Sequence, residues 1–197
     1  EREQIRREWA REVKEHELIR QEWEDELKRK HEEEDRVRAG FFWEQPRGNP
    51  QCLRHGARGW TARIANVPRT YDPVTACMET SVEIHGVRHP SPAHCEDRGC
   101  GGVFGHWVVN YSEPMCFTHF DNFKDKGCTS PGSRRRRIES PLENLQPGEY
   151  ANDNWREMCM TTGADFRNLH FDSPGWCENW GKYGAWGIWE IEDYGCQ

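Results

Sequence analysis

Three histidines and a cysteine lie within eleven residues, at His85, His89, His94 and Cys95. Imidazoles and a thiolate are the donors that zinc prefers in proteins. The prolines at positions 90 and 92 prevent one regular helix from presenting all four side chains. Surface histidines beside a disulfide-bonded cysteine explain the same residues, so we predict no metal and no cofactor, with a zinc site as the alternative.

Two further histidines each stand two residues before a carboxylate, His119 before Asp121 and His170 before Asp172. Such a pair can orient an imidazole as a general base. The sequence contains no nucleophile elbow, zinc-protease motif or phosphate-binding glycine loop to accompany either pair. We therefore predict that the protein is not an enzyme and has no catalytic residues.

The nine cysteines all follow residue 51 and occur singly, without the paired CxxC knuckles of zinc ribbons. This spacing favours a disulfide framework and therefore a secreted or cell-surface location. Cys100, placed among glycines, is the candidate for a free or intermolecular thiol, and the pairing of the others is left open. The eight disulfide candidates are Cys52, Cys77, Cys95, Cys116, Cys128, Cys159, Cys177 and Cys196.

Aromatic residues crowd the end of the chain. Between residues 41 and 197 there are 21 aromatic residues but only four leucines. Aromatic rings at alternate strand positions can form a platform on which sugar rings stack, as in secreted carbohydrate-binding modules, whereas the alternative is that the rings form the core. The candidate glycan platform comprises Trp176, Trp180, Tyr183, Trp186 and Trp189.

The first 38 residues are expected to form one long helix that precedes these sites. The segment from Ile5 to Lys14 returns fourteen residues later as Ile19 to Lys28, with six of ten positions identical. Fourteen residues make about four helical turns, so the repeat places its apolar residues on one stripe. Read as a heptad seam, the stripe includes too many charged residues for a self-sufficient zipper. We expect it to dock on other copies of the protein, the alternative being a solvated stalk. The candidate assembly residues are Ile5, Trp9, Val13, Ile19, Trp23 and Leu27.

The run Arg134, Arg135, Arg136 and Arg137 lies between turn-forming residues in a chain of net charge −7. We expect a loop over residues 129–149 whose arginines are either solvated or in contact with the acidic helix of a neighbouring copy, and we predict no nucleic-acid partner. Asn110 begins a glycosylation sequon. The chain starts inside a helix and is expected to be part of a longer protein, so a membrane would be reached only through an upstream segment.

Alternating residues predict strands over residues 59–67, 80–87, 103–111 and 184–191, and a short helix ending at Met160. The predicted fold class is α+β, with a long charged N-terminal helix followed by a small, loop-rich, disulfide-stapled and mainly antiparallel β domain. The predicted domains are residues 1–40 and 41–197.

Several motifs resemble an uncharacterised family of mushroom-forming (basidiomycete) fungi, whose members join a hydrophobic anchor, a Glu/Arg-rich coiled stretch and a Cys/Trp-rich C-terminal domain. The similarity covers nearly the whole chain and implies this architecture and a fungal source, without an activity. The motifs are Phe42-Trp43-Glu44-x-Pro46-Arg47, Cys52-Leu53-Arg54, Tyr71-Asp72, Ala76-Cys77-Met78-Glu79-Thr80, Ile84-His85-Gly86, Cys95-Glu96-Asp97-Arg98-Gly99, Gly105-His106-Trp107, residues 122–128 and residues 180–189.

Together these observations predict a structural protein. Its helical rods would bundle into an oligomer or filament, with copies of the protein itself as the partners. The alternative is a carbohydrate-binding module on a stalk, with cell-wall glycans as ligands.

Overall fold

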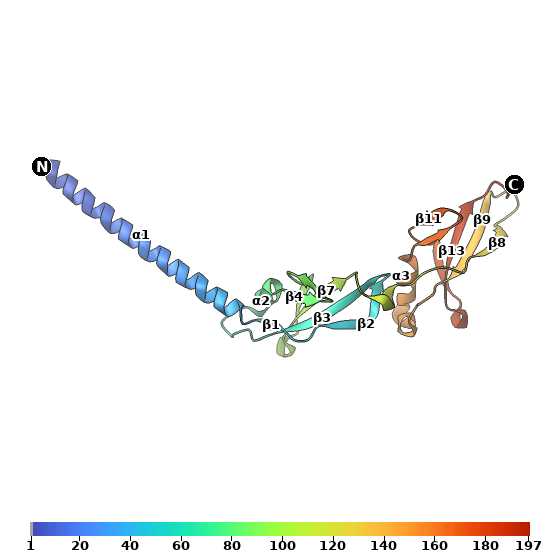
Figure 1. Cartoon of the computed structure of the whole chain (residues 1–197), viewed down its shortest axis with the longest axis horizontal. Coiled ribbons are helices and arrows are strands. Elements are labelled where there is room, and N and C mark those ends of the chain that lie inside the picture. The colour runs from blue at the N-terminus through green and yellow to red at the C-terminus, as the bar shows by residue number, and fades with distance from the viewer. Residues whose placement is uncertain (1) are drawn as a thin grey trace.

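The computed structural model describes residues 2–197, and within this range the side chains of residues 5, 7, 8, 10, 151 and 152 lie outside the description. The chain forms an elongated molecule in which a single helix leads into two β modules placed one after the other (Figure 1). We call residues 42–116 the first module and residues 117–197 the second module. The N-terminus and the C-terminus lie at opposite ends of this arrangement.

Helix α1 (Arg2–Arg38) confirms the predicted long helix. Its surface carries ion pairs one turn apart, such as Lys30 with Glu26 at 3.1 Å, and each exposed pair of this kind adds about 0.2–0.5 kcal/mol. At its C-terminal end Arg38 donates to the Tyr71 hydroxyl at 3.1 Å and pairs with Glu79 at 3.2 Å. The ring of the buried Phe41 packs edge-on against Tyr71. These contacts fasten the end of the helix to the first module.

The first module is built on a five-stranded antiparallel sheet in the order β1-β3-β7-β6, with β2 pairing with β3. Helix α2 packs beside this sheet, and its N-cap Asp72 accepts a bond from the Thr75 amide at 2.7 Å. A short hairpin of β4 and β5 follows the helix. The bounds are β1 (Phe42–Trp43), β2 (Arg47–Arg54), β3 (Ala57–Ala65), α2 (Pro73–Glu79), β4 (Val82–Ile84), β5 (Val87–His89), β6 (His94–Asp97), η1 (Gly99–Gly101), β7 (Val103–Val109) and η2 (Pro114–Cys116).

The second module is built on a four-stranded antiparallel sheet in the order β12-β13-β9-β8. Helix α3 lies beside it and leads into the hairpin of β10 and β11. Residues 129–149 are not the loop that the sequence predicted, because β9 lies within them. The bounds are β8 (Lys124–Cys128), β9 (Arg135–Pro141), η3 (Pro147–Asp153), α3 (Asn154–Met160), β10 (Ala164–Phe166), β11 (Leu169–Phe171), β12 (Trp176–Asn179), η4 (Gly181–Tyr183) and β13 (Ala185–Glu192).

The two modules repeat one another. Both follow a strand with a helix, a hairpin, a strand, a one-turn 3-10 helix and a final strand. Residues 77–107 align without a gap with residues 159–189, at an offset of 82, and eleven of these 31 positions are identical. The registers agree as well, since Cys95 pairs with Gly105 as Cys177 pairs with Gly187. Residues 41–197, predicted as one domain, therefore contain a duplicated fold.

Gly105 and Gly187 occupy equivalent positions of the two modules, and neither position has room for a side chain. A Cβ on Gly105 would lie 2.6 Å from the Trp107 ring, and one on Gly187 would lie 2.8 Å from Trp189. Real Cβ atoms essentially never approach a ring carbon this closely. In each module a tryptophan therefore lies against glycine backbone, and the core is built from rings.

The modules meet through a buried carboxylate. Glu149 accepts a bond from the Cys52 amide at 2.7 Å, and the Asn154 amide bonds both to Glu149 and to the Cys52 carbonyl. Gln51 donates to the Gly148 carbonyl at 2.7 Å. Because a buried charged group is strongly destabilising without its partners, these bonds hold β2 of the first module against the second module.

Candidate functional site

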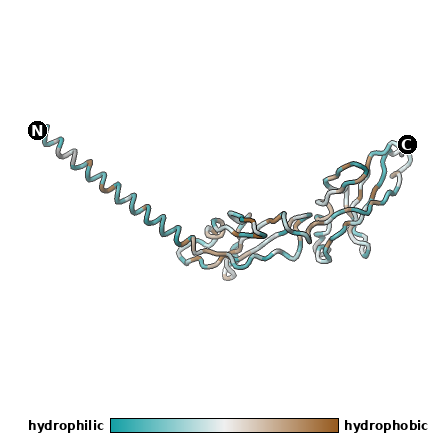
Figure 2. The backbone as a smooth tube through the Cα atoms, in the orientation of Figure 1, coloured by the Kyte–Doolittle hydropathy of each residue, from teal (hydrophilic) through white to brown (hydrophobic). Residues whose placement is uncertain are grey.

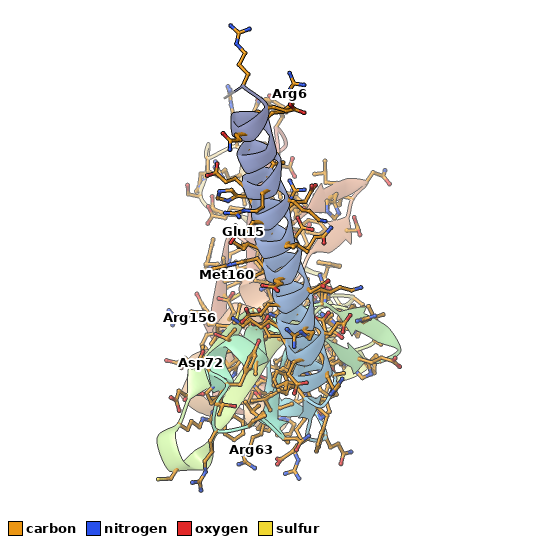
Figure 3. The ribbon with its side chains drawn as sticks, turned by 90° about the vertical axis from the view of Figure 1, so that its left-hand side faces the viewer. Arg6, Glu15, Arg63, Asp72, Arg156 and Met160 are labelled. Atoms are coloured by element: carbon orange, nitrogen blue, oxygen red, sulfur yellow. A yellow bond between two sulfur atoms is a disulfide. The ribbon has the colours of Figure 1, made fainter. Side chains whose placement is uncertain are left out.

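The apolar stripe of α1 is uncovered within this chain. Trp9 and Trp23 leave 70% and 67% of their surface exposed. Val13, Ile19 and Leu27 are also exposed on the same stripe, and the side chain of the sixth candidate, at position 5, lies outside the described residues. Figure 2 shows α1 as mostly hydrophilic with separated hydrophobic turns, and Figure 3 shows its side chains projecting outward all around the helix.

The arginine run lies on the second module instead of in a free loop. Arg136 pairs with Asp193 at 2.5 Å and with Asp125 at 3.0 Å. The backbone amide of Gly127, and then Arg136, hold the pKa of Asp125 below its usual value, and the amide of Gly195, and then Arg136, do the same for Asp193. Arg137 bonds to Glu139 at 2.7 Å. Arg134 and Arg135 are the exposed members of the run.

The five aromatic residues of the expected platform do not share one face. Trp186 and Trp189 are three residues apart on β13, so they point to opposite sides of the sheet. Trp189 is buried among the rings of Phe120, Phe123 and Phe166. It belongs to the core, as the alternative interpretation of this cluster held.

The remaining rings surround a carboxylate on the outer face of the second module. Trp176 donates its indole N–H to Glu178 Oε1, and Trp180 donates to Oε2, both at 2.9 Å. The Trp180 indole N–H, then that of Trp176, lowers the pKa of Glu178. Trp180 stacks on Trp186 with ring centroids 4.4 Å apart. Tyr183 is exposed on the adjoining η4 turn. We call Trp176, Glu178, Trp180 and Trp186 the indole–carboxylate cluster.

Two cations border this cluster. Lys124 lies 4.9 Å above the Trp186 ring, and Arg137 lies 5.3 Å from the ring of Trp176. The face therefore presents two half-buried indoles, those of Trp176 and Trp180, together with an ionised carboxylate and positive charges. Such a combination offers both stacking and hydrogen bonding to a polar ring.

The first module has a related arrangement around the equivalent carboxylate. Glu96 corresponds to Glu178, and its Oε2 accepts bonds from Arg98 at 2.7 Å and from His106 at 3.0 Å. Arg98, then His106, lowers the pKa of Glu96. Arg98 lies 4.2 Å above the Phe104 ring, as Trp180 lies on Trp186. Neither glutamate was predicted as a site residue, although the repeat at an offset of 82 residues marks them as a matching pair.

Eight cysteines form four disulfides, and Cys100 is exposed without a disulfide partner. The pairing follows the duplication, because each module has one short-range and one long-range bridge. The bridges are Cys52–Cys116, Cys77–Cys95, Cys128–Cys196 and Cys159–Cys177.

The histidines of the expected donor cluster are separated by the fold. His85 contacts the buried Glu113 at 2.9 Å, while His89 contacts the Tyr111 hydroxyl at 2.5 Å. His94 stacks on His106 with ring centroids 4.3 Å apart. Cys95 is in a disulfide. Among the described residues, no group of three or more His, Cys, Asp or Glu side chains is arranged to hold a metal ion.

The two predicted imidazole–carboxylate pairs lie at the surface. His119 is 3.6 Å from Asp121, and both side chains are exposed. His170 bonds to Asp165 at 2.7 Å and to Asp172 at 3.3 Å. Asp165 and then Asp172 raise the pKa of His170.

Two further predictions concern glycosylation and the membrane. Asn110, the candidate glycosylation site, is exposed just after β7. Within residues 2–197, each helix is too short or too polar to cross a bilayer.

Comparisons of the chain with protein-family models, with curated proteins and with solved structures gave no match in any of the three.

Proposed function

We propose that this is a structural protein that associates with copies of itself through α1. The observation that carries the proposal is the exposed stripe containing Trp9 and Trp23. The helix contacts the rest of its own chain near its C-terminal end, where Val37 packs on the first module and Arg38 pairs with Glu79. The stripe from Trp9 to Leu27 lies along the part of the helix that projects away from both modules (Figure 1).

A comparison of free energies favours burial of the apolar stripe of α1 against a partner. An aromatic side chain buries roughly 150–250 Å², and each Å² of apolar surface removed from water contributes about 25 cal/mol. A pair of helices that covers four indoles therefore gains more than the exposed ion pairs along α1, which contribute at most about 1 kcal/mol each. Covering the stripe is the largest stabilisation open to this helix.

In the proposed assembly, each helix α1 contributes its own two β modules, which lie outside the paired helices. The four disulfides support an oxidising, secreted or cell-surface environment.

Replacing both Trp9 and Trp23 with alanine should shift the protein from an oligomer to a monomer, because the stripe then loses its two largest apolar surfaces. Light scattering coupled to size exclusion measures the mass of each species under non-reducing conditions. The matched control is Leu18→Ala, which removes an exposed apolar side chain from the opposite face of α1. An unchanged mass in the double variant contradicts the proposal.

A second candidate function is glycan binding by the indole–carboxylate cluster. The observation that favours it is that two indole N–H groups hold Glu178 in place beside the half-exposed Trp176 and Trp180. Sugar rings stack on such indoles while a carboxylate accepts bonds from their hydroxyl groups.

Trp180→Ala should then weaken binding of soluble β-glucan and chitin oligosaccharides at least tenfold by calorimetry, while the melting temperature stays close to that of the parent protein. Tyr194→Ala is the control, since Tyr194 is exposed outside the cluster. The glycan proposal fails if neither class of oligosaccharide binds the parent protein, or if both variants bind equally well.

A further inference from the structure

The stripe of α1 contains charged residues at regular places between its apolar ones. Two rows make up the seam that a partner helix would contact. The first row is Trp9, His16, Trp23, Lys30 and Val37, and the second is Ile5, Glu12, Ile19, Glu26 and Glu33.

A parallel, in-register pair would place like charges together in this seam. Every residue would lie opposite its own copy, so Glu12 would face Glu12, Glu26 would face Glu26 and Lys30 would face Lys30. Like charges at a shared, partly desolvated seam are destabilising. Parallel pairing therefore conflicts with the charge pattern of the stripe.

We infer that two copies pair through α1 in the antiparallel direction, about a two-fold axis that crosses the seam at the height of Gln21. This inference rests on the proposed function and adds the relative direction of the two paired helices. Across the seam, a residue of one row then lies opposite the residue of the other row that is equally distant from Gln21. Residues that flank the seam lie instead beside the residues that flank the same edge in the partner copy. Ile19 packs against the partner copy's Trp23, and the partner copy's Glu26 lies opposite His16. The partner copy's Lys30 lies opposite Glu12.

The flanking positions agree with this register. Glu15 lies beside the partner copy's Arg29, and Arg6 lies beside Glu34 of the partner copy. Val13 and Leu27, which flank the same seam, come together as an apolar pair. Like charges meet only where the flanking edges cross the axis, with Arg20 beside the partner copy's Arg20 and Glu22 beside the partner copy's Glu22. In the seam, Trp9 lies along the aliphatic stem of the partner copy's Glu33. Favourable contacts outnumber these, because every off-axis contact occurs twice in a two-fold pair.

The antiparallel pair also explains the length of α1. The overlap begins with Arg6 beside the partner copy's Glu34 and covers most of the helix Arg2–Arg38, while Val37 stays packed on its own first module. The two pairs of modules then point away from each other at the two ends of a central rod. An isologous contact of this kind closes on itself and gives a dimer.

Charge exchange between Glu12 and Lys30 tests the register. Glu12→Lys or Lys30→Glu alone should each raise the dimer dissociation constant at least tenfold, because an attraction becomes a repulsion at two places. The double exchange should restore the parent value, and an equimolar mixture of the two single variants should form mixed dimers. Lys14→Glu is the control, since Lys14 is exposed on the outer face of α1. In a parallel pair the single variants would behave like this control, and that result overturns the inference.

A distance measurement tests the antiparallel orientation separately from self-association through α1. Spin labels on Gln4→Cys, in a Cys100→Ser background, should lie about 50 Å apart in the antiparallel dimer, since a helix rises about 1.5 Å per residue. Labels within about 20 Å of each other would show a parallel dimer and overturn the orientation alone, because a helix is about 10 Å wide. A parent protein that sediments as a monomer at all concentrations overturns self-association itself.

Discussion

Replacing Trp189 with alanine is expected to lower the free energy of unfolding of the second module by about 3–5 kcal/mol. Only 2% of Trp189 is exposed, and its ring packs edge-on against Phe120, 4.9 Å away, and against Phe166. The variant leaves a large cavity in a core that contains few aliphatic side chains able to close it. The indole N–H also loses its bond to the Ser173 carbonyl.

Chemical unfolding combined with hydrogen exchange measures this loss and assigns it to a module. Amides of β9 and β13 should exchange faster, whereas those of β3 and β7 should keep most of their protection. Trp176→Ala is the matched control, because that ring is half-buried on the outer face of the same sheet, and it should cost less than half as much. Equal losses in the two variants would show that Trp189 is not the centre of the core.

Removing the Cys128–Cys196 disulfide with paired serine substitutions should cost about 4 kcal/mol. The bridge joins residues 68 apart in the sequence and ties the end of the chain to β8. In the chain-entropy model, a crosslink destabilises the unfolded state more when it closes a longer loop. Chemical denaturation of the oxidised variant, followed by tryptophan fluorescence, gives the change.

The matched control is removal of Cys159–Cys177, whose residues are 18 apart in the same module. The same model assigns this shorter loop about 3 kcal/mol, so the Cys128–Cys196 variant should be the less stable of the two. The opposite order would mean that native contacts around the bridges outweigh loop closure in the unfolded chain.

Local features of the protein were predictable from the sequence because they depend on neighbouring residues. The fourteen-residue repeat predicts α1, since helical bonds and ion pairs join residues three or four apart. Alternation predicts the strands near residues 59–67, 103–111 and 184–191, which correspond to β3, β7 and β13. The expected strand over 80–87 is instead interrupted at His85 and Gly86, whose φ angles of 51° and 77° form the turn between β4 and β5.

The candidate sites were harder to predict, for reasons that differ between residues. The sequence was sufficient to predict that Trp186 and Trp189 face opposite sides of the sheet, since they are three residues apart on one strand. The burial of Trp189 required knowing that Phe120 and Phe166 come to the same face. Arg136 looks solvated in the sequence, whereas its partners Asp125 and Asp193 lie 11 and 57 residues away.

The sequence by itself determined the long charged helix, its exposed indole stripe and the supply of cysteines and rings for a disulfide-stapled, leucine-poor β fold. It also contained the 82-residue repeat, which becomes evident once the two modules are compared. Only the tertiary structure decided which cysteines pair, which rings enter a core and which carboxylates the indoles and guanidinium groups hold. The physical reason is that these outcomes depend on strand register and on contacts between distant residues, which no local pattern of residues encodes.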